Sequence, residues 1–199
     1  MLVRKVAKNA ADILKIKRFL YHCYVHDLKW IPAKDNVSQW HVVNPTDSLP
    51  IFADFYDSHA TWIAVYDDED LVASCRIIKP KEKRLEFELY QHISNLIPLR
   101  MPRVELNRFA VKSEYIHGRA VIELFLEVLE HCLDEKIATL FISAPAAMVP
   151  ICLNLGFTET KSQEFRYFPS DPQPSRILCL DFTDRDRIEG IHRRCRNIS

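Results

Sequence analysis

The sequence predicts a single α/β domain built on a mixed β-sheet. Runs rich in β-formers alternate with runs of helical period, which is typical of a sheet covered by helices. Adjacent β-rich runs also occur, and these indicate antiparallel hairpins. A chain of 199 residues with 48% hydrophobic residues is long enough for one buried core, and no change in composition marks a second. We expect this domain over residues 1–182, and then a charged tail over 183–199 that forms a helix or a frayed end.

Charge and hydropathy exclude several classes of function. Lys plus Arg and Asp plus Glu each number 27, so no net field attracts nucleic acid or an anionic membrane. No run of about 18 apolar residues is present for a membrane span. The N-terminus lacks the apolar core of a secretion signal. We therefore expect a cytoplasmic protein with no nucleic-acid partner and no stable insertion in a membrane.

The cysteines and histidines predict neither a disulfide framework nor a metal site. Six cysteines are scattered without a C-x-x-C pair, which favours buried thiols in a reducing compartment. His22 and His26 stand one helical turn apart, but no acidic or cysteine partner completes a set of zinc ligands. Cys132 and Cys152 lie in apolar runs, and this disfavours a cysteine nucleophile. We expect no metal.

The first part of the chain predicts a strand, a helix and a long irregular segment. Residues 2–7 alternate and are expected to form an edge strand, and Asn9 is placed to cap a helix over 10–24. Residues 31–57 contain three prolines and no persistent period, which predicts a lid-like loop. Its apolar side chains, including Trp40, are expected to fold over a hydrophobic ligand.

A hairpin with a charged residue follows this segment. Two β-rich runs, over 61–66 and 71–78, flank a polar bend. Arg76 is charged within an otherwise apolar strand, and a buried charge needs a partner. The candidate partners are the carboxylates of Asp54, Asp57 and Glu105. The alternative for the first two is a pair of solvated loop carboxylates.

The rest of the chain continues the alternation of strands and helices. The expected elements are a helix over 86–97, a strand over 104–111, a helix over 121–134, a strand over 138–144, a helix over 146–155 ending at Gly156, and closing strands over 157–167 and 175–182. The outward stripe of helix 121–134 is expected to be Glu123, Glu127, Glu130 and Asp134. The basic turn over 79–84 predicts a solvated loop or a surface for an acidic carrier protein.

The stretch over 104–120 places a glycine between a strand and a helix. The chain has only three glycines, and Gly118 lies at the first turn of the predicted helix. Free N–H groups at a helix start favour an anion such as phosphate, and a glycine lets the ligand approach the backbone. The alternative is that Gly118 only begins a structural helix.

Three segments of this sequence resemble one enzyme superfamily. Residues 115–120, YIHGRA, resemble the R/Q-x-x-G-x-G/A segment of the GNAT acyltransferases, with Tyr115 in place of Arg or Gln. Residues 150–157, PICLNLGF, resemble their "fYeklGF" segment, with Cys152 in place of the tyrosine. Residues 105–111, ELNRFAV, resemble the E-x-x-R-F-x-V strand of the acyl-homoserine-lactone synthases and N-acyl amino acid synthases, a branch of that superfamily.

The resemblance implies a GNAT fold and a role for individual residues. Glu105 is the expected general base, directly or through water, on a strand that a β-bulge splays. The expected catalytic residues are Glu105, Arg108 and Arg76. The expected contacts to the carrier arm and its phosphate are Phe109, Ala110, Val111, His117, Gly118, Arg119 and Ala120. The expected substrate contacts are Trp30, Asp54, Asp57, Phe141 and Ser143.

The function implied is N-acyl transfer to a small amino-acid-like acceptor. The donor is acyl-CoA or an acyl carrier protein thioester, with no tightly bound cofactor. Cys152 replaces the tyrosine that protonates the leaving thiolate in many relatives, which disfavours simple acetyl transfer. Apolar side chains on strand 138–144 and in the lid favour a medium or long acyl chain. The alternatives are an acetyl-CoA-dependent N-acetyltransferase and a module that binds acyl thioesters without turnover.

Overall fold

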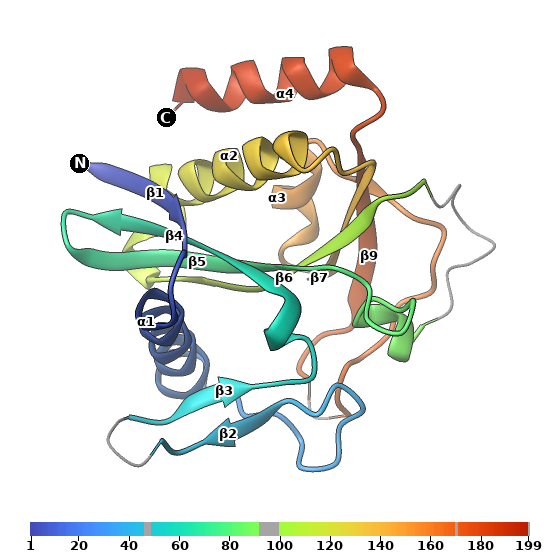
Figure 1. The fold of residues 1–199 in the computed structure, drawn as a ribbon. Helices are drawn as coiled ribbons and strands as arrows, with labels where there is room; N and C mark the ends of the chain where they lie inside the picture. Colours follow the sequence, from blue (N-terminus) through green and yellow to red (C-terminus); the bar gives the residue numbers. More distant parts are fainter. Residues whose placement is uncertain (46–48, 92–99, 170, 199) are drawn as a thin grey trace.

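The fold is a seven-stranded mixed sheet with helices on both faces (Figure 1). The computed structural model describes residues 1–45, 49–91, 100–169 and 171–198. The strands, in sheet order, are β1 (Leu2–Val6), β4 (Ala60–Asp67), β5 (Asp70–Ile78), β6 (Arg103–Val111), β7 (Thr139–Pro145), β9 (Ser175–Asp181) and β8 (Thr158–Glu159). Neighbouring strands are antiparallel except for β6 and β7, which are parallel. The predicted mixed α/β sheet is confirmed.

Two helices cover one face of the sheet with a third packed over them, and one helix with a small hairpin covers the other face (Figure 1). The first group comprises α2 (Arg119–Asp134), α3 (Val149–Asn154) and α4 (Arg185–Ile198), and the second comprises α1 (Ala10–Tyr21), β2 (His41–Val43) and β3 (Ile51–Ala53). Asn9 caps α1, and its side chain accepts the Asp12 N–H at 2.9 Å. A π-helical turn over His22–Asp27 continues α1. None of the described helices is long and apolar enough to cross a membrane.

The elements around the centre of the sheet agree with the sequence periods. β4 and β5 form the predicted hairpin, and α2 connects the parallel strands β6 and β7. Gly156 follows α3 at a φ of 99°, a left-handed conformation that favours glycine. A Cβ at this position would collide with Ile191 of α4. The predicted glycine stop is therefore confirmed, and it also lets α4 approach.

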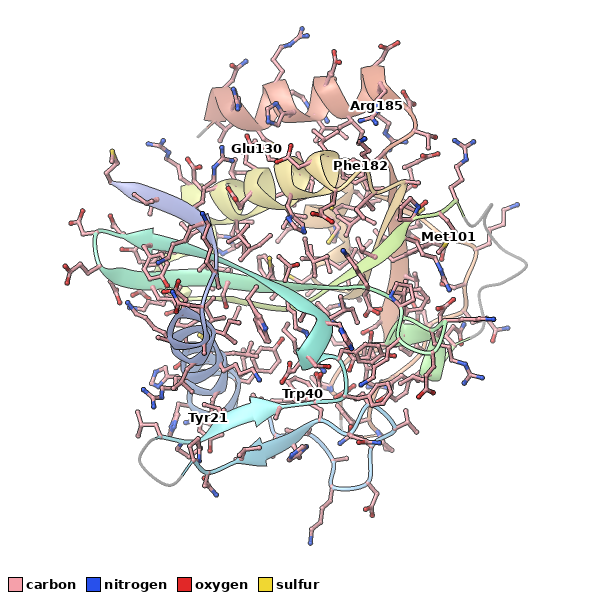
Figure 2. The ribbon with its side chains drawn as sticks, in the orientation of Figure 1. Tyr21, Trp40, Met101, Glu130, Phe182 and Arg185 are labelled. Atoms are coloured by element: carbon pink, nitrogen blue, oxygen red, sulfur yellow. The ribbon has the colours of Figure 1, made fainter. Side chains whose placement is uncertain are left out.

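Three of the four acidic residues predicted for the outward stripe of α2 are partly or fully covered, and Asp134 is exposed as predicted. Glu123 is only 9% exposed. Arg4 of β1 lies 3.7 Å from Glu123, 3.5 Å from Glu127 and 3.0 Å from Glu130. Glu130 lies on α2 below α4, and His192 and Arg196 of α4 also contact it, each at 3.0 Å (Figure 2). The reason is that α4 packs over α2, with Ile188, Ile191 and Cys195 buried, so the charged tail is a helix of the core.

The segment over 31–57 is more regular than the sequence predicts. β2 and β3 pair as an antiparallel hairpin, with Val42 opposite Phe52. Trp40 and Phe52 are 5% and 2% exposed and pack with residues of α1, so the hairpin contributes to the core beneath the sheet (Figure 2). A continuous irregular lid was therefore the wrong prediction here, because each strand is only three residues long and too short to show a period.

Two further elements are less regular than predicted over the described residues. Of the helix expected over 86–97, residues 86–91 contain a single 3-10 turn, Phe87–Leu89, and residues 92–97 lie outside the described part of the chain. The strand expected over 157–167 pairs only at Thr158–Glu159, with one isolated bridge between Phe165 and Ser175. In both cases tertiary contacts hold aromatic residues in a turn although their composition favours a regular element.

Candidate active site

The parallel strands β6 and β7 separate near the middle of the sheet. Their ladder ends where Leu106 pairs with Ile142, although β6 continues to Val111 and β7 to Pro145. A cavity of about 580 Å³ opens at this point, a volume typical of small-molecule sites. Its wall includes side chains from both cores, above and below the sheet. The cavity therefore passes through the sheet where the two strands part.

A β-bulge in β6 shapes the wall of the cavity. Arg76 of β5 pairs with Asn107, but Ser74 pairs with Ala110, so β6 carries one residue more than β5 between these pairs. Arg108 lies within the bulge at a φ of 52°, a left-handed conformation that costs ~1–3 kcal/mol for a residue with a side chain. The expected bulge is confirmed, and it directs the side chains of Asn107 and Arg108 toward the same carboxylate, Glu86.

Arg76 binds the two aspartates that the sequence proposed for it. It is 1% exposed, and its Nη1 donates to Asp54 Oδ1 at 2.7 Å and to Asp57 Oδ1 at 2.6 Å. Its Nε donates to Asn107 Oδ1 at 2.9 Å. Glu105, the third predicted partner, is not within ion-pair distance of Arg76; among the described residues, Glu86 takes that place at 3.5 Å.

Glu86 is the residue that sequence reasoning missed. Its Oε1 accepts from Arg108 Nη2 at 2.6 Å, and its Oε2 accepts from Asn107 Nδ2 at 2.8 Å. Arg108 also donates to Asp54 Oδ2 at 2.7 Å, and its guanidinium lies 3.5 Å from the centre of the Trp40 ring. Glu86 lies on the cavity wall. Two buried arginines need compensating negative charge, and a third carboxylate beside the two aspartates was therefore to be expected. No sequence pattern points to Glu86.

The charges of this cluster balance without Glu105. The three cations are Arg76, Arg108 and Lys17, whose Nζ lies 2.5 Å from Asp57 Oδ2, and the three paired carboxylates are Asp54, Asp57 and Glu86. Glu105 is a fourth carboxylate, fully buried, with no ion pair among the described residues. An unmatched buried carboxyl group favours its protonated form.

The pKa values of two acidic residues diverge accordingly. Burial raises the pKa of Glu105 from 4.5 to about 8, and the negative charge of Glu86 adds to this increase. Burial alone would also raise the pKa of Asp54, but the positive charges of Arg76 and Arg108 outweigh it and hold this pKa well below its ordinary value. Such a divergence of pKa values is a mark of acid–base sites.

Glu105 itself lies behind the cavity wall. Its Oε2 accepts the Phe87 N–H at 3.2 Å, and its Oε1 accepts the Tyr167 hydroxyl proton at 3.5 Å. Tyr167 and Glu86 are on the wall, whereas Glu105 is not. The predicted base is therefore reached from the cavity through its neighbours.

The residues predicted to hold the carrier arm fall into two groups. Phe109, Ala110 and Val111 line the cavity, and the Tyr24 hydroxyl donates to the Phe109 carbonyl at 3.2 Å. His117, Gly118, Arg119 and Ala120 lie at the start of α2, next to the wall residues Ile116 and Val121. Gly118 is the N-cap and provides no side-chain acceptor for the first N–H groups of α2.

The predicted substrate contacts are only partly at the cavity. Trp30 and Ser143 line it, and the Trp30 Nε1 donates to Asp171 Oδ1 at 3.0 Å. Asp54 and Asp57 lie behind the wall, in the ion cluster. Phe141 is fully buried against Phe87, with ring centres 5.4 Å apart, and does not line the cavity.

The part of the cavity between α2 and α3, here called the apolar arm, has an apolar lining. It is lined by Val121, Leu124, Phe125 and Val128 of α2, by Ile151 and Cys152 of α3, and by Met148, Leu155 and Phe157. Burial raises the pKa of the Cys152 thiol to about 11, and that of Cys132 to about 12, so both stay protonated at neutral pH. This arm provides an apolar surface and no ionised nucleophile.

The two histidines considered as zinc ligands lie on the surface, in the π-helical turn that continues α1. His22 and His26 have ring centres 5.0 Å apart, and Asp27 lies 3.7 Å from His22. Over the described ranges, no group of three His, Cys, Asp or Glu side chains is arranged to hold a metal ion.

The chain is similar to one known domain family and to several solved structures. Residues 42–126 match the family described as "Acetyltransferase (GNAT) domain". No curated protein matches the chain. FeeM, an N-acyl amino acid synthase from uncultured soil microbes, has a TM-score of 0.64 at 16% identity, over 92% of each chain. BjaI, a CoA-dependent acyl-homoserine lactone synthase, has a TM-score of 0.69 at 18% identity, over 98% of this chain and 90% of that chain.

A second CoA-dependent acyl-homoserine lactone synthase, MesI, agrees with these matches. Its TM-score is 0.68 at 18% identity, over 99% of this chain and 96% of that chain. These structures share the overall fold of this chain, and the domain match covers the hairpin of β4 and β5, the central strand β6 and the first half of α2. Residues 42–126 therefore match a GNAT acetyltransferase domain, and the whole chain shares its fold with solved structures of N-acyl amino acid and acyl-homoserine lactone synthases.

Proposed function

We propose that the protein transfers a medium or long acyl chain from a thioester to the amino group of a small amino-acid-like molecule. One observation carries this proposal: a single cavity connects an apolar arm with a buried carboxylate and arginine cluster, at the point where β6 and β7 separate. The relatives support it, since FeeM is an N-acyl amino acid synthase and BjaI was solved with isopentyl-CoA.

The donor enters along β6. Phe109, Ala110 and Val111 line the cavity on a stretch of β6 that β7 does not pair with, so backbone groups there are available to a pantetheine arm. The carrier phosphate binds at the first turn of α2, beside Gly118. The acyl chain fills the apolar arm between α2 and α3. The donor is acyl-CoA or an acyl carrier protein thioester.

The acceptor binds at the polar end, near Glu86 and Tyr167. Its ammonium supplies the positive charge that ionised Glu105 lacks, and it transfers one proton toward this carboxylate. The neutral amine then attacks the thioester carbonyl carbon. When the tetrahedral intermediate collapses, the C–S bond breaks, the nitrogen loses its second proton, and the leaving thiolate receives it.

The ion cluster positions this end of the cavity. Arg108 and Glu86 touch the cavity, while Asp54, Asp57 and Arg76 hold them from behind. We assign Arg108 to orient the acceptor and the two aspartates to fix the arginines. The alternative of a binding module without turnover is disfavoured, because Glu105 is buried without an ion pair among the described residues and lies within hydrogen-bond distance of a cavity-wall hydroxyl, an arrangement typical of acid–base sites.

We place the protein in the cytoplasm on the evidence of its free thiols. All six cysteines are free, and five of them are buried, which supports a reducing compartment such as the cytoplasm.

The acyl preference provides the test of this proposal. Each buried methylene contributes ~0.8 kcal/mol, so octanoyl-CoA is expected to exceed acetyl-CoA in kcat/KM by ~10²-fold or more. Release of free thiol in the presence of mixed amino acids measures the rates. Ile151→Phe narrows the apolar arm and should remove the octanoyl advantage while retaining the acetyl rate. A preference of the parent protein for acetyl-CoA would contradict this proposal and favour an N-acetyltransferase.

Gly118→Val is expected to weaken donor binding ~10-fold or more without loss of fold, because a β-branched side chain crowds the approach to the α2 N–H groups. Inside the protein a Cβ at this position meets only the Tyr115 carbonyl, at 3.5 Å, so the fold does not require glycine there. Calorimetric titration with CoA measures the affinity. Gly190→Val in α4 is the control, because a Cβ there meets nothing within 4 Å. Equal affinity for all three proteins would show that Gly118 only begins a helix.

A further inference from the structure

Glu105 has no surface of its own on the cavity. It is fully buried, and the described residues give its carboxyl group two hydrogen-bond partners, the Phe87 N–H and the Tyr167 hydroxyl. A backbone N–H holds its proton and does not exchange it with a substrate. A base in this position therefore needs another group that reaches both the carboxyl group and the acceptor.

Tyr167 is such a group. Its side chain lines the cavity, and its hydroxyl lies 3.5 Å from Glu105 Oε1. The ring is fixed by aromatic neighbours, with centre distances of 4.8 Å to Tyr90 and 5.0 Å to Phe165. Catalytic hydrogen bonds are often long before substrate binds, and this one needs only a small shift to shorten.

We propose that Tyr167 relays the proton between the acceptor amine and Glu105, an inference that rests on the N-acyl transfer proposed above. The ammonium gives a proton to Tyr167 Oη while the Tyr167 hydroxyl proton passes to Glu105 Oε1. The products of this step are a neutral amine, a neutral tyrosine and a protonated carboxyl group, so charge and protons balance. Neither residue ends the step as a buried charge.

The surroundings keep Tyr167 neutral between transfers. Burial raises its pKa well above 10, and the charges of Glu105 and Glu86 add to this. The titratable and charged groups that face Glu105 and Tyr167 among the described residues are Glu86, Arg76 of β5, Arg108 of β6, Tyr56 and Tyr90, together with the polar hydroxyl of Ser143. The arginines are engaged by Asp54 and Glu86, which leaves the tyrosine hydroxyl as the mobile proton donor.

Tyr167→Phe tests the relay by its pH dependence. At neutral pH its kcat for octanoyl transfer is expected to fall ~10²-fold, since this is the lower range of acid–base contributions. Above the pKa of the acceptor amine the defect should shrink, because the amine then arrives without its extra proton. Glu105→Gln combined with Tyr167→Phe should be no slower than Glu105→Gln alone. Tyr90→Phe, whose hydroxyl contacts Ser38 and not Glu105, is the matched control.

A defect that persists equally at all pH values would overturn the relay and leave Tyr167 a packing residue. A second measurement does not need turnover: carbon NMR of the Glu105 carboxyl group. Loss of a hydrogen-bond donor to the carboxylate should raise the pKa of Glu105 in Tyr167→Phe but not in Tyr90→Phe. An unmoved pKa in Tyr167→Phe would refute the contact itself. Absence of octanoyl transfer in the parent protein would count against the proposed function, while the titration still decides the Tyr167–Glu105 link.

Discussion

Glu105→Gln is expected to lower turnover by ~10²–10⁴-fold, because the amide has the volume of the acid but accepts no proton. Donor binding should be retained, since Glu105 does not line the cavity. In the parent protein the rate should rise with pH around the Glu105 pKa of about 8, and the variant should lack this rise. Thiol release across a pH series measures both effects. A variant with the parental rate would remove Glu105 from the role of base.

The stability of the same variant separates this result from misfolding. The pKa of Glu105 is higher in the folded state than its ordinary 4.5, so the folded protein binds the extra proton between about pH 4.5 and 8. The free energy of unfolding of the parent protein therefore falls as pH rises through this window. Glu105→Gln has no proton to lose, and we expect it to melt above the parent at pH 8. A variant that melts well below the parent at pH 8 would contradict this account.

Arg76→Met is expected to destabilise the fold by ~3–5 kcal/mol, the loss typical of removing one partner from a buried ion pair. The substitution preserves much of the side-chain length but removes the one cation that contacts all three carboxylates, so Arg108 and Lys17 are left to balance Asp54, Asp57 and Glu86. The free energy of unfolding, measured by urea denaturation at pH 7, gives the loss.

Arg176→Met on β9 is the control for Arg76→Met. Arg176 pairs with Glu159 and Glu164, but its side chain is 42% exposed, and surface pairs contribute only ~0–1 kcal/mol. Similar losses for the two variants would show that the Arg76 cluster does not hold the site together.

The sequence was informative where a residue type conflicted with its surroundings. An arginine in an apolar strand required carboxylates, and Asp54 and Asp57 were found at the spacing that supplies them. Glu86 and Tyr167 carried no such mark, because both lie outside regular strands and helices and reach the site only when the chain closes. Neither residue belongs to a periodic pattern that assigns it a face.

The sequence predicted the long elements of the fold correctly, and the prediction was wrong for the short elements. β4, β5, β6 and α2 are long enough for their period to assign a buried face. β2 and β3 are too short for this, so their hairpin was predicted as a loop. The glutamates of α2 indicated a solvated face, but the sequence did not show that α4 would bring partners to cover it.

The stoichiometry of thiol and amide decides whether the protein transfers an acyl chain to an amine. Purified protein is incubated with octanoyl-CoA and mixed amino acids, free thiol is counted, and the amide is identified by mass spectrometry. N-acyl transfer predicts equal amounts of CoA thiol and N-octanoyl amide, and no thiol when the amines are omitted. Thiol release without amine would indicate a thioesterase, and no release in either case would indicate a binding module; both results would contradict N-acyl transfer.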